Sequence, residues 1–258
     1  MTTTLFDLTG KVALLTGASK GMGKAMAEGL AEHGAKVVIS SRKLDQCEAV
    51  AAEINEKYGA GTAVAIACNI GYKEQLQQLV DTTHEKLGPI DILVANAGVN
   101  PFYGPMSEIP DSAFDKILSS NIKANHWLCQ MVAPDMLAKG EGSIMITSSV
   151  GAFSASDTLG TYNISKLADI ALVRNLALEM GPSGVRVNAI CPGLIKTDFA
   201  KALWDNPEAA KRANEAIPLR RLGEAEDFKG VAVFLASKAS AYVTGQAMTV
   251  CGGSNMWS

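Results

Sequence analysis

Residues 11–30, "KVALLTGASKGMGKAMAEGL", decide the fold, because an apolar strand, a glycine-rich turn and an amphipathic helix follow one another directly. The first part is short and apolar on both faces, as buried parallel strands are. Gly17, Gly21 and Gly23 then follow with the spacing G-x-x-x-G-x-G. Glycines at this point let the backbone turn tightly and approach a pyrophosphate, which the amino terminus of the helix holds with free N–H groups. The stretch predicts a dinucleotide-binding unit, with a plain turn as the alternative.

The same alternation of short apolar runs and longer amphipathic runs continues to the end of the chain. It implies right-handed crossovers and a sheet covered by helices on both faces. The sequence contains no linker, low-complexity tract or internal repeat, so we expect one domain over residues 1–258. The predicted fold class is α/β, a single doubly wound Rossmann domain with a seven-stranded parallel sheet. The expected strands are residues 11–18, 35–41, 62–69, 91–97, 142–149, 185–192 and 246–253.

Composition excludes several classes of function. The net charge is −3 and the basic residues are spread among acidic ones, so neither nucleic acid nor an anionic membrane surface is an expected partner. Apolar runs are too short to span a membrane, and no signal peptide is recognisable, which predicts a cytoplasmic location. The five cysteines contain no CxxC pair and the three histidines have no second ligand at metal spacing. We therefore expect neither a disulfide framework nor a metal site.

Ligands of such sheets bind beyond the carboxyl ends of the strands. Folds that prefer NAD place a carboxylate at the end of the second strand, whereas this chain has Ser41 and Arg42 there, with Lys20 and Lys43 nearby. A guanidinium can form paired hydrogen bonds with a 2′-phosphate, which predicts NADP(H) over NAD(H), unless these cations are only solvated. The expected cofactor-binding residues are Gly17, Ser19, Lys20, Gly21, Met22, Gly23, Ser41, Arg42, Asn69, Ile70, Asn96, Ala97, Gly98, Tyr162, Lys166, Pro192, Gly193, Ile195 and Thr197.

Tyr162 and Lys166 are four residues apart at the start of a predicted helix and so share one face. A phenol with a pKa near 10 is a poor acid or base at neutral pH. An ammonium about 4 Å away, at an effective dielectric constant of about 20, contributes roughly 4 kcal/mol, or about 3 pKa units before desolvation offsets part of it. Ser149 ends the fifth strand and can offer its hydroxyl to the same substrate oxygen. Asn121 lies inside a helix, where its amide is expected to serve a water or a gap in the backbone.

Taken together, these residues resemble the short-chain dehydrogenases/reductases of the classical type. The resemblance covers essentially the whole chain, through "TGASKGMG" (16–23), "NAG" (96–98), Asn121, Ser149, "YNISK" (162–166), "PGLIKT" (192–197) and "GQAMTVCGG" (245–253). It implies that Tyr162 transfers the hydroxyl proton, Ser149 orients the reacting oxygen, Lys166 lowers the pKa of the tyrosine and binds the nicotinamide ribose, and Asn121 anchors a proton-relay water. Asn69 departs from the acidic residue that the family often has for the adenine.

Within that family, "GVNPFYGP", "PGLIKTDFAKALW" and "RRLGEAEDF" look most like NADP(H)-dependent carbonyl reductases. The resemblance also implies a homotetramer built on the long helix expected over residues 111–140 and on the helix that contains residues 170–180.

The substrate is expected to be a hydrophobic or aromatic ketone, an aldehyde or the corresponding alcohol. Residues 194–217 are long for a connection and have a helical pattern of their own, which is typical of a mobile lid. Apolar and aromatic residues that follow several strands are expected to line the pocket, although packing between loops would explain each of them singly. The expected pocket residues are Val99, Phe102, Tyr103, Ser149, Val150, Phe153, Leu194, Phe199, Leu203 and Trp204.

Two alternatives remain open at this point. A 3-oxoacyl thioester reductase acting on carrier-protein or coenzyme A substrates would use the same residues, but it needs a basic docking patch, for which Lys196 and Lys201 are weak indications. A non-catalytic nucleotide-sensing scaffold is disfavoured because Ser149, Tyr162 and Lys166 are all intact.

Overall fold

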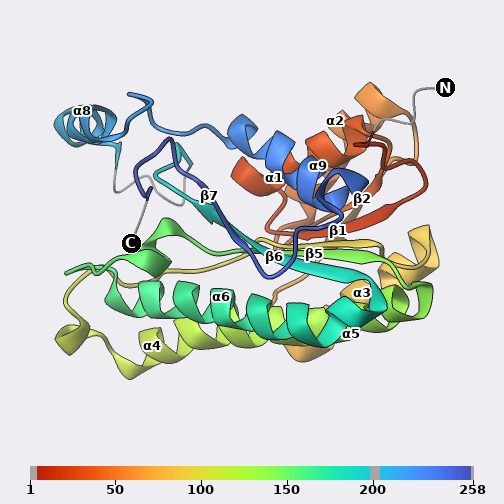
Figure 1. Cartoon of the computed structure of the whole chain (residues 1–258), viewed down its shortest axis with the longest axis horizontal. Coiled ribbons are helices and arrows are strands. Elements are labelled where there is room, and N and C mark those ends of the chain that lie inside the picture. The colour runs from red at the N-terminus through yellow and green to blue at the C-terminus, as the bar shows by residue number, and fades with distance from the viewer. Residues whose placement is uncertain (1–4, 198–203, 257–258) are drawn as a thin grey trace.

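The computed structural model describes residues 5–197 and 204–256 (Figure 1). Within them, seven parallel strands form one sheet in the order β3-β2-β1-β4-β5-β6-β7, which confirms the predicted fold class. The strands are β1 (Val12–Thr16), β2 (Lys36–Ser41), β3 (Ala63–Ala67), β4 (Ile92–Ala95), β5 (Gly142–Thr147), β6 (Val185–Pro192) and β7 (Ala247–Val250). Most of them end before the predicted carboxyl boundary, because the chain turns there into the loops that form the candidate site.

Helices cover both faces of the sheet (Figure 1). They are α1 (Gly21–Glu32), α2 (Leu44–Tyr58), α3 (Lys73–Leu87), α4 (Asp111–Leu118), α5 (Ala124–Lys139), α6 (Gly160–Met180), α8 (Pro207–Ala216) and α9 (Lys229–Ala236). Helices α1, α2 and α9 lie on one face, and α3, α4, α5 and α6 on the other. No helix among the described residues is long and apolar enough to span a membrane.

Residues 111–140 read as one long helix in the sequence, but the structure divides them. A π-helical turn, η2 (Ser119–Lys123), separates α4 from α5. Such turns occur where one extra residue is accommodated, often at a functional site. Here the turn contains Asn121, whose side chain is completely buried.

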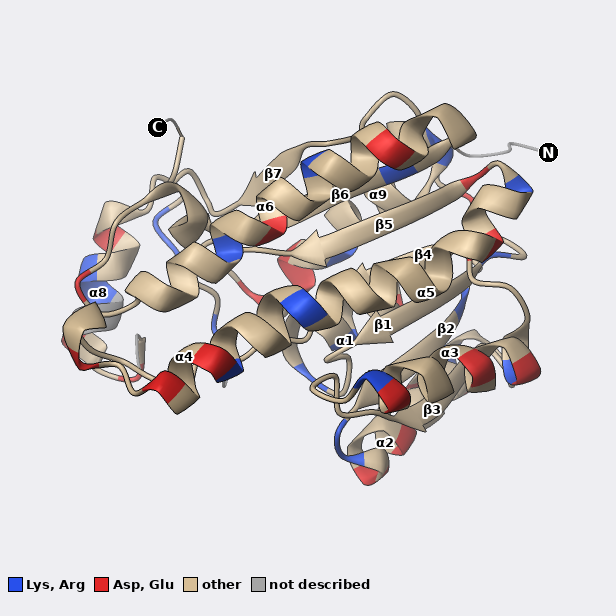
Figure 2. Ribbon diagram, turned by 90° about the horizontal axis from the view of Figure 1, so that it is seen from below, with Lys and Arg blue, Asp and Glu red and all other residues tan. Residues whose placement is uncertain are grey.

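Alternating strand residues supply two apolar cores. Leu14 and Val38 belong to the core shared with α3, α5 and α6, whereas Leu15 and Ile39 belong to the core shared with α1, α2 and α9. Burial on both faces explains why these strands are apolar throughout rather than alternating. Charged residues of both signs lie interspersed along the helices that surround the cores (Figure 2).

The strand order reverses between β1 and β4, which are neighbours although β2 and β3 come between them in sequence. The loops after these two strands leave the same edge of the sheet and diverge to opposite faces. This is the position at which open α/β sheets bind their ligands, and the predicted functional residues follow the strands at this edge.

Candidate active site

The glycine-rich loop between β1 and α1 is folded too tightly for larger residues. Gly17 has a φ of +64°, and a Cβ there would lie 3.0 Å from the Cα of Ala97. A Cβ on Gly23 would lie 2.3 Å from the carbonyl oxygen of Gly17, well inside contact distance. The loop therefore closes on itself at the amino end of α1, where free N–H groups can receive a phosphate.

Asn96 joins this loop to the two neighbouring strand ends. Its Nδ2 donates to the carbonyl oxygens of Thr16 (3.2 Å) and Gly17 (3.1 Å), and its main-chain N–H donates to Thr16 Oγ1 (3.1 Å). Its Oδ1 accepts a hydrogen bond from Thr147 Oγ1 at 3.2 Å, at the end of β5. Asn96 was expected to be a cofactor ligand. In the structure, its side-chain amide is used to hold the ends of β1, β4 and β5 together.

The residues expected to set the preference between NADP(H) and NAD(H) lie at the end of β2 and just before α1. Lys20 directly precedes α1 and Arg42 directly follows β2, and both side chains are exposed. Ser41 Oγ lies 3.1 Å from Cys47 Sγ. Asn69, after β3, accepts a hydrogen bond from the Gly71 N–H with its side-chain oxygen (3.1 Å). The neighbouring Ile70 is half-buried and packs against the core.

The loop after β6 comes close to the glycine-rich loop. The methyl group of Thr197 lies 3.3 Å from the place that a Cβ would take on Gly21. Gly193 is held by a hydrogen bond from its N–H to the carbonyl oxygen of Val250 (3.0 Å), and Ile195 forms an isolated bridge with Gly223. Three of the predicted motifs, at residues 16–23, 96–98 and 192–197, therefore meet at one edge of the sheet.

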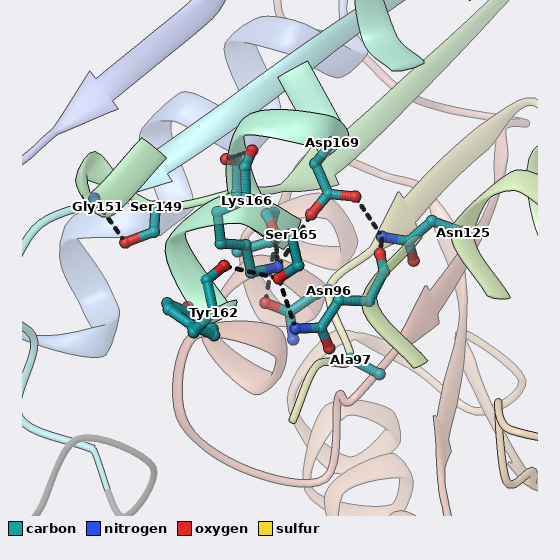
Figure 3. A network of polar contacts seen from close by, with 12 residues as sticks. Asn96, Ala97, Asn125, Ser149, Gly151, Tyr162, Ser165, Lys166 and Asp169 are labelled. Carbon is teal, nitrogen blue, oxygen red and sulfur yellow. Dashed lines mark hydrogen bonds and ion pairs between the residues drawn. The ribbon is translucent and has the colours of Figure 1, made fainter. Parts of the chain in front are cut away.

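Helix α6 brings Tyr162 and Lys166 together as its spacing predicts. Lys166 Nζ lies 5.7 Å from the centre of the Tyr162 ring, and it donates to the carbonyl oxygen of Thr147 at 2.8 Å (Figure 3). Ser149 forms a hydrogen bond with Tyr162, and its Oγ also accepts from the Gly151 N–H (3.0 Å), which caps the short helical turn η3 (Val150–Phe153). A Cβ on Gly98 would lie 3.6 Å from Lys166 Nζ, so the loop after β4 adjoins the ammonium.

Asn121 uses its whole amide to hold the backbone. Its Oδ1 accepts from the Val99 N–H (2.8 Å), and its Nδ2 donates to the Val99 carbonyl (3.0 Å) and to Ser165 Oγ (3.0 Å). Of the two roles considered for this amide, the structure supports filling a gap in the backbone. The proton-relay water that the resemblance implies stays a prediction, and the main-chain oxygen of Asn121 accepts a hydrogen bond from Asn125 Nδ2 at 2.6 Å.

Two polar residues that the sequence reasoning missed complete the network. Asp169 Oδ2 lies 3.1 Å from Lys166 Nζ, and Asp169 Oδ1 accepts from Asn125 Nδ2 at 3.0 Å (Figure 3). Asp169 follows Lys166 by three residues and Asn125 follows Asn121 by four, so both lie one helical turn from a predicted catalytic residue. The sequence signal that could have identified them is a charged or amide side chain among apolar helix residues, one turn from a predicted catalytic residue.

Electrostatics at the tyrosine differ from the expectation. Burial raises the pKa of Tyr162, whereas the Lys166 ammonium and the hydrogen bond with Ser149 lower it. The net direction is upward, because the loss of solvation outweighs the attraction of the ammonium. Burial by itself lowers the pKa of Lys166, but Asp169 and Tyr162 together raise it by more than burial lowers it. The net direction for Lys166 is therefore also upward.

The residues expected to line the pocket have mixed surroundings. Tyr103 is 43% exposed, Val150 is half-buried, and Phe153 packs against the core shared with α5 and α6. Trp204 Nε1 donates to the Thr197 carbonyl at 3.2 Å. The rest of the set lies close to other loops: Val99 is bound by Asn121, the Phe102 ring lies 2.9 Å from a Cβ position on Gly104, and the Leu194 carbonyl accepts from Gly223. Phe199 and Leu203 lie outside the described residues.

No group of three or more His, Cys, Asp or Glu side chains in residues 5–197 and 204–256 could hold a metal ion. The polar groups at this edge of the sheet are instead a phenol, an ammonium, a hydroxyl and backbone amides. That set can transfer a proton and bind a phosphorylated ligand.

Comparisons with known proteins agree with this geometry. A family model described as enoyl-(acyl carrier protein) reductase matches residues 17–255. Dehydrogenase/reductase SDR family member 4 of Bos taurus is 41% identical over 248 residues, covering 96% of this chain and 88% of that protein.

Two solved structures are similar over nearly their whole length. A 7α-hydroxysteroid dehydrogenase complexed with NADH and 7-oxo glycochenodeoxycholic acid has a TM-score of 0.91 and 38% identity, covering 96% of this chain and 95% of that one. A gluconate 5-dehydrogenase from Burkholderia cenocepacia J2315 in complex with NADP and tartrate has a TM-score of 0.91 and 30% identity, covering 97% of both chains. With its glycine-rich loop, strand order and Ser149, Tyr162 and Lys166 geometry, the chain belongs to the classical short-chain dehydrogenase/reductase family of oxidoreductases.

Proposed function

We propose that the protein is an NADP(H)-dependent oxidoreductase that interconverts a hydrophobic or aromatic ketone or aldehyde and its alcohol, with Tyr162 as the general acid and base. The observation that carries the proposal is the placement of the Lys166 ammonium 5.7 Å from the Tyr162 ring, beside Ser149 and at the edge where the glycine-rich loop begins. A phenol with an ammonium and a hydroxyl beside it can hold or release the proton of a substrate oxygen.

The loop formed by Gly17 and Gly23 fits a dinucleotide, because a Cβ at either position would collide with the loop's own neighbours and prevent the tight turn that lets the backbone approach a pyrophosphate. The residues named above as cofactor ligands would hold it, with Asn96 acting through the loop rather than by contact. The nicotinamide would supply or accept the hydride. One neighbour was solved with NADH and another with NADP, so the preference rests on this chain's own Arg42 and Lys20. Both are exposed cations, Lys20 just before α1 and Arg42 just after β2, and a 2′-phosphate would receive charge-assisted hydrogen bonds from them.

The side chains divide the chemistry among themselves. Tyr162 donates a proton to the carbonyl oxygen in reduction and removes it from the hydroxyl in oxidation. Ser149, already within hydrogen-bonding distance of Tyr162, orients that same oxygen. Lys166 counteracts the effect of burial on the pKa of the phenol and offers an N–H to the ribose. Asn121 holds the backbone of Val99 and so fixes the loop that carries Gly98.

The expected substrate is apolar because of the side chains that follow the strand ends. Tyr103, Val150 and Trp204 are partly or largely exposed on segments that follow β4, β5 and β6, and an aromatic or aliphatic carbonyl compound would cover them. One structural neighbour was solved with 7-oxo glycochenodeoxycholic acid, which is a precedent for a ligand with a large ring skeleton and a ketone in that protein. We also propose that residues 194–217 close over the substrate as a lid, with Trp204 as its described aromatic residue.

The alternative functions receive less support. A reductase of carrier-protein thioesters would need free cations beside the site, but Lys196 forms an ion pair with Glu224 at 3.0 Å, and Lys201 lies outside the described residues. A nucleotide-sensing scaffold would not need a buried ammonium beside a phenol.

The direct test follows NADPH and NADH consumption by the purified protein with aliphatic, aromatic, dicarbonyl and oxoacyl substrates. We expect turnover with apolar carbonyl compounds, and a loss of about 10²- to 10⁴-fold in Tyr162→Phe with dinucleotide binding retained. Unchanged turnover in that variant would exclude Tyr162 as the acid and base. Turnover of only small, highly charged carbonyl compounds would contradict the proposed substrate class.

Cofactor preference has its own test. We expect at least a tenfold higher kcat/KM with NADPH than with NADH, and Arg42→Gln should remove most of that preference by losing hydrogen bonds to a charged group, about 1.5–3 kcal/mol. Lys36→Gln is the matched control, because it removes one exposed positive charge at the opposite end of the same strand, β2. Equal effects of the two substitutions would mean that only overall charge matters.

We further propose a homotetramer. Ile164, Leu167 and Leu178 are large apolar side chains that are exposed on α6. An exposed apolar helix face of this kind is typical of an interface between subunits. Light scattering at micromolar concentration checks the assembly, and a monomer would contradict it. The cytoplasmic location stays a prediction.

A further inference from the structure

Asp169 is a fully buried carboxylate next to the proposed catalytic lysine. It is 0% exposed, and its Oδ2 lies 3.1 Å from Lys166 Nζ (Figure 3). A buried charge is unfavourable unless it is paired and its lone pairs are satisfied. The roles assigned above to Tyr162, Ser149 and Lys166 do not require a carboxylate at this place, so its presence calls for an explanation.

Asn125, on the neighbouring helix α5, holds the carboxylate from its other side. Its Nδ2 donates to Asp169 Oδ1 at 3.0 Å and to the main-chain oxygen of Asn121 at 2.6 Å. The two oxygens of Asp169 therefore accept from two different donors, Asn125 and Lys166. A carboxylate can accept at both ends, whereas an amide in its place would have to present an N–H to one of these donors.

The same arrangement fixes the ammonium of Lys166. An ammonium has three N–H donors, and two of them are used by Asp169 Oδ2 and by the Thr147 carbonyl at 2.8 Å. With two tetrahedral directions set, the third is set as well. That N–H is left for a ligand or for the phenol of Tyr162.

We infer that Asp169, held by Asn125, is a positioning residue that orients the Lys166 ammonium and, as its counter-ion, sets the pH at which the Tyr162–Lys166 pair loses its first proton. This inference rests on the proposed function of the pair. It assigns Asp169 no contact with the substrate or the cofactor.

The direction of the effect follows from charge. A nearby negative charge opposes the loss of a proton from Tyr162 and from Lys166, so removing it lowers the first pKa of the pair whichever proton leaves first. Burial has the largest influence on both groups, raising the pKa of Tyr162 and lowering that of Lys166, and the charge of Asp169 raises both. Asp169 lies two helical turns from Tyr162, about 10 Å along the axis, which corresponds to about 1 pH unit at an effective dielectric constant of about 20.

Other titratable groups face the pair from the elements packed against α6. Cys129 lies on α5 and Cys191 on β6, and burial raises the pKa of these thiols to about 12 and about 11. Both are therefore uncharged at neutral pH. Tyr103, on the loop after β4, also interacts with Tyr162. Asp169 supplies the negative charge that the variants below remove.

The test is an NMR pH titration of isotope-labelled tyrosine and lysine side chains, with Tyr162→Phe and Lys166→Met identifying the two signals. In Asp169→Asn, we expect the first of the two groups to titrate at least about 1 pH unit below the first one in the wild type. The acidic limb of the kcat/KM profile for oxidation should move by the same amount. Asn125→Ala is the matched control, because it removes a hydrogen bond from the carboxylate but keeps the charge, and its shift should be much smaller.

An unchanged or higher first midpoint in Asp169→Asn would overturn the inference and leave Asp169 with a structural role only. Asp169→Leu removes the charge and fills the space with apolar atoms, so it serves the same test where Asp169→Asn does not fold. The titration needs no substrate. Absence of turnover would therefore refute the proposed function alone, and an unmoved midpoint would refute the inference alone.

Discussion

Replacing Lys166 with methionine would remove the buried ammonium while keeping a long apolar side chain. Lys166 is 4% exposed and Asp169 is 0% exposed, so the variant leaves a carboxylate inside the protein without its partner. The Thr147 carbonyl also loses its hydrogen bond from Nζ. Breaking a buried ion pair by removing one member costs about 3–5 kcal/mol. For a chain of this size, we expect the unfolding temperature to fall by roughly 10 °C.

Thermal and urea unfolding, followed by circular dichroism at one fixed protein concentration, would measure the loss. The control is the double variant Lys166→Met/Asp169→Leu, in which both charges are replaced by apolar groups. Such replacements are often neutral or stabilising, so the double variant should regain most of the stability. Both variants should be inactive, because both lack the ammonium beside Tyr162.

The loss of stability caused by Lys166→Met should also depend on pH. Burial raises the pKa of Asp169, and in this variant the opposing influence of Lys166 is gone. The folded protein then binds a proton more tightly than the unfolded chain, so its stability relative to the wild type should rise as the pH falls from neutral to about 5. A loss below about 1 kcal/mol, or a double variant less stable than the single one, would refute the reasoning.

Two further substitutions test other parts of the site and fold. Gly23→Ala places a Cβ 2.3 Å from the Gly17 oxygen, so we expect the stability to fall by about 1–3 kcal/mol. Dinucleotide affinity, measured by calorimetric titration, should be at least tenfold weaker. Gly230→Ala is the control, because the space around its new Cβ is open, and it should lower neither the stability nor the affinity. Asp91→Ala removes the buried acceptor of the Val12 N–H (2.9 Å) at the far edge of the sheet, and it should cost about 1–3 kcal/mol in urea unfolding while leaving dinucleotide affinity unchanged.

The sheet and the glycine-rich loop were predictable because their signals are local. The strands around Leu14 and Val38 are apolar on both faces, and chain chirality then leaves few ways to connect parallel strands. The pair Tyr162 and Lys166 was predictable for the same reason, since helical spacing alone puts both on one face.

Other features depend on contacts between residues that are distant in the sequence, so the local pattern gives at most a weak signal for them. The π-helical turn at Asn121 exists together with hydrogen bonds to Val99, 22 residues earlier. Asp169 makes sense only beside Lys166 and Asn125, and a sequence does not reveal that α5 packs so closely on α6. The upward pKa of Tyr162 follows from the loss of solvation around the phenol, which depends on tertiary packing.

Asn96 fastens the ends of β1, β4 and β5 with one side chain, and this has a consequence for engineering. A chimaera of two relatives joined anywhere between Thr16 and Asn96 would inherit the threonine from one parent and the asparagine from the other. Unless the two parents place these residues at matching positions along their strands, Asn96 would not reach the carbonyl oxygens of Thr16 and Gly17, and the glycine-rich loop would lose its connection to the end of β4. Crossovers placed after Thr147 avoid this mismatch, because they transfer the whole joint from a single parent.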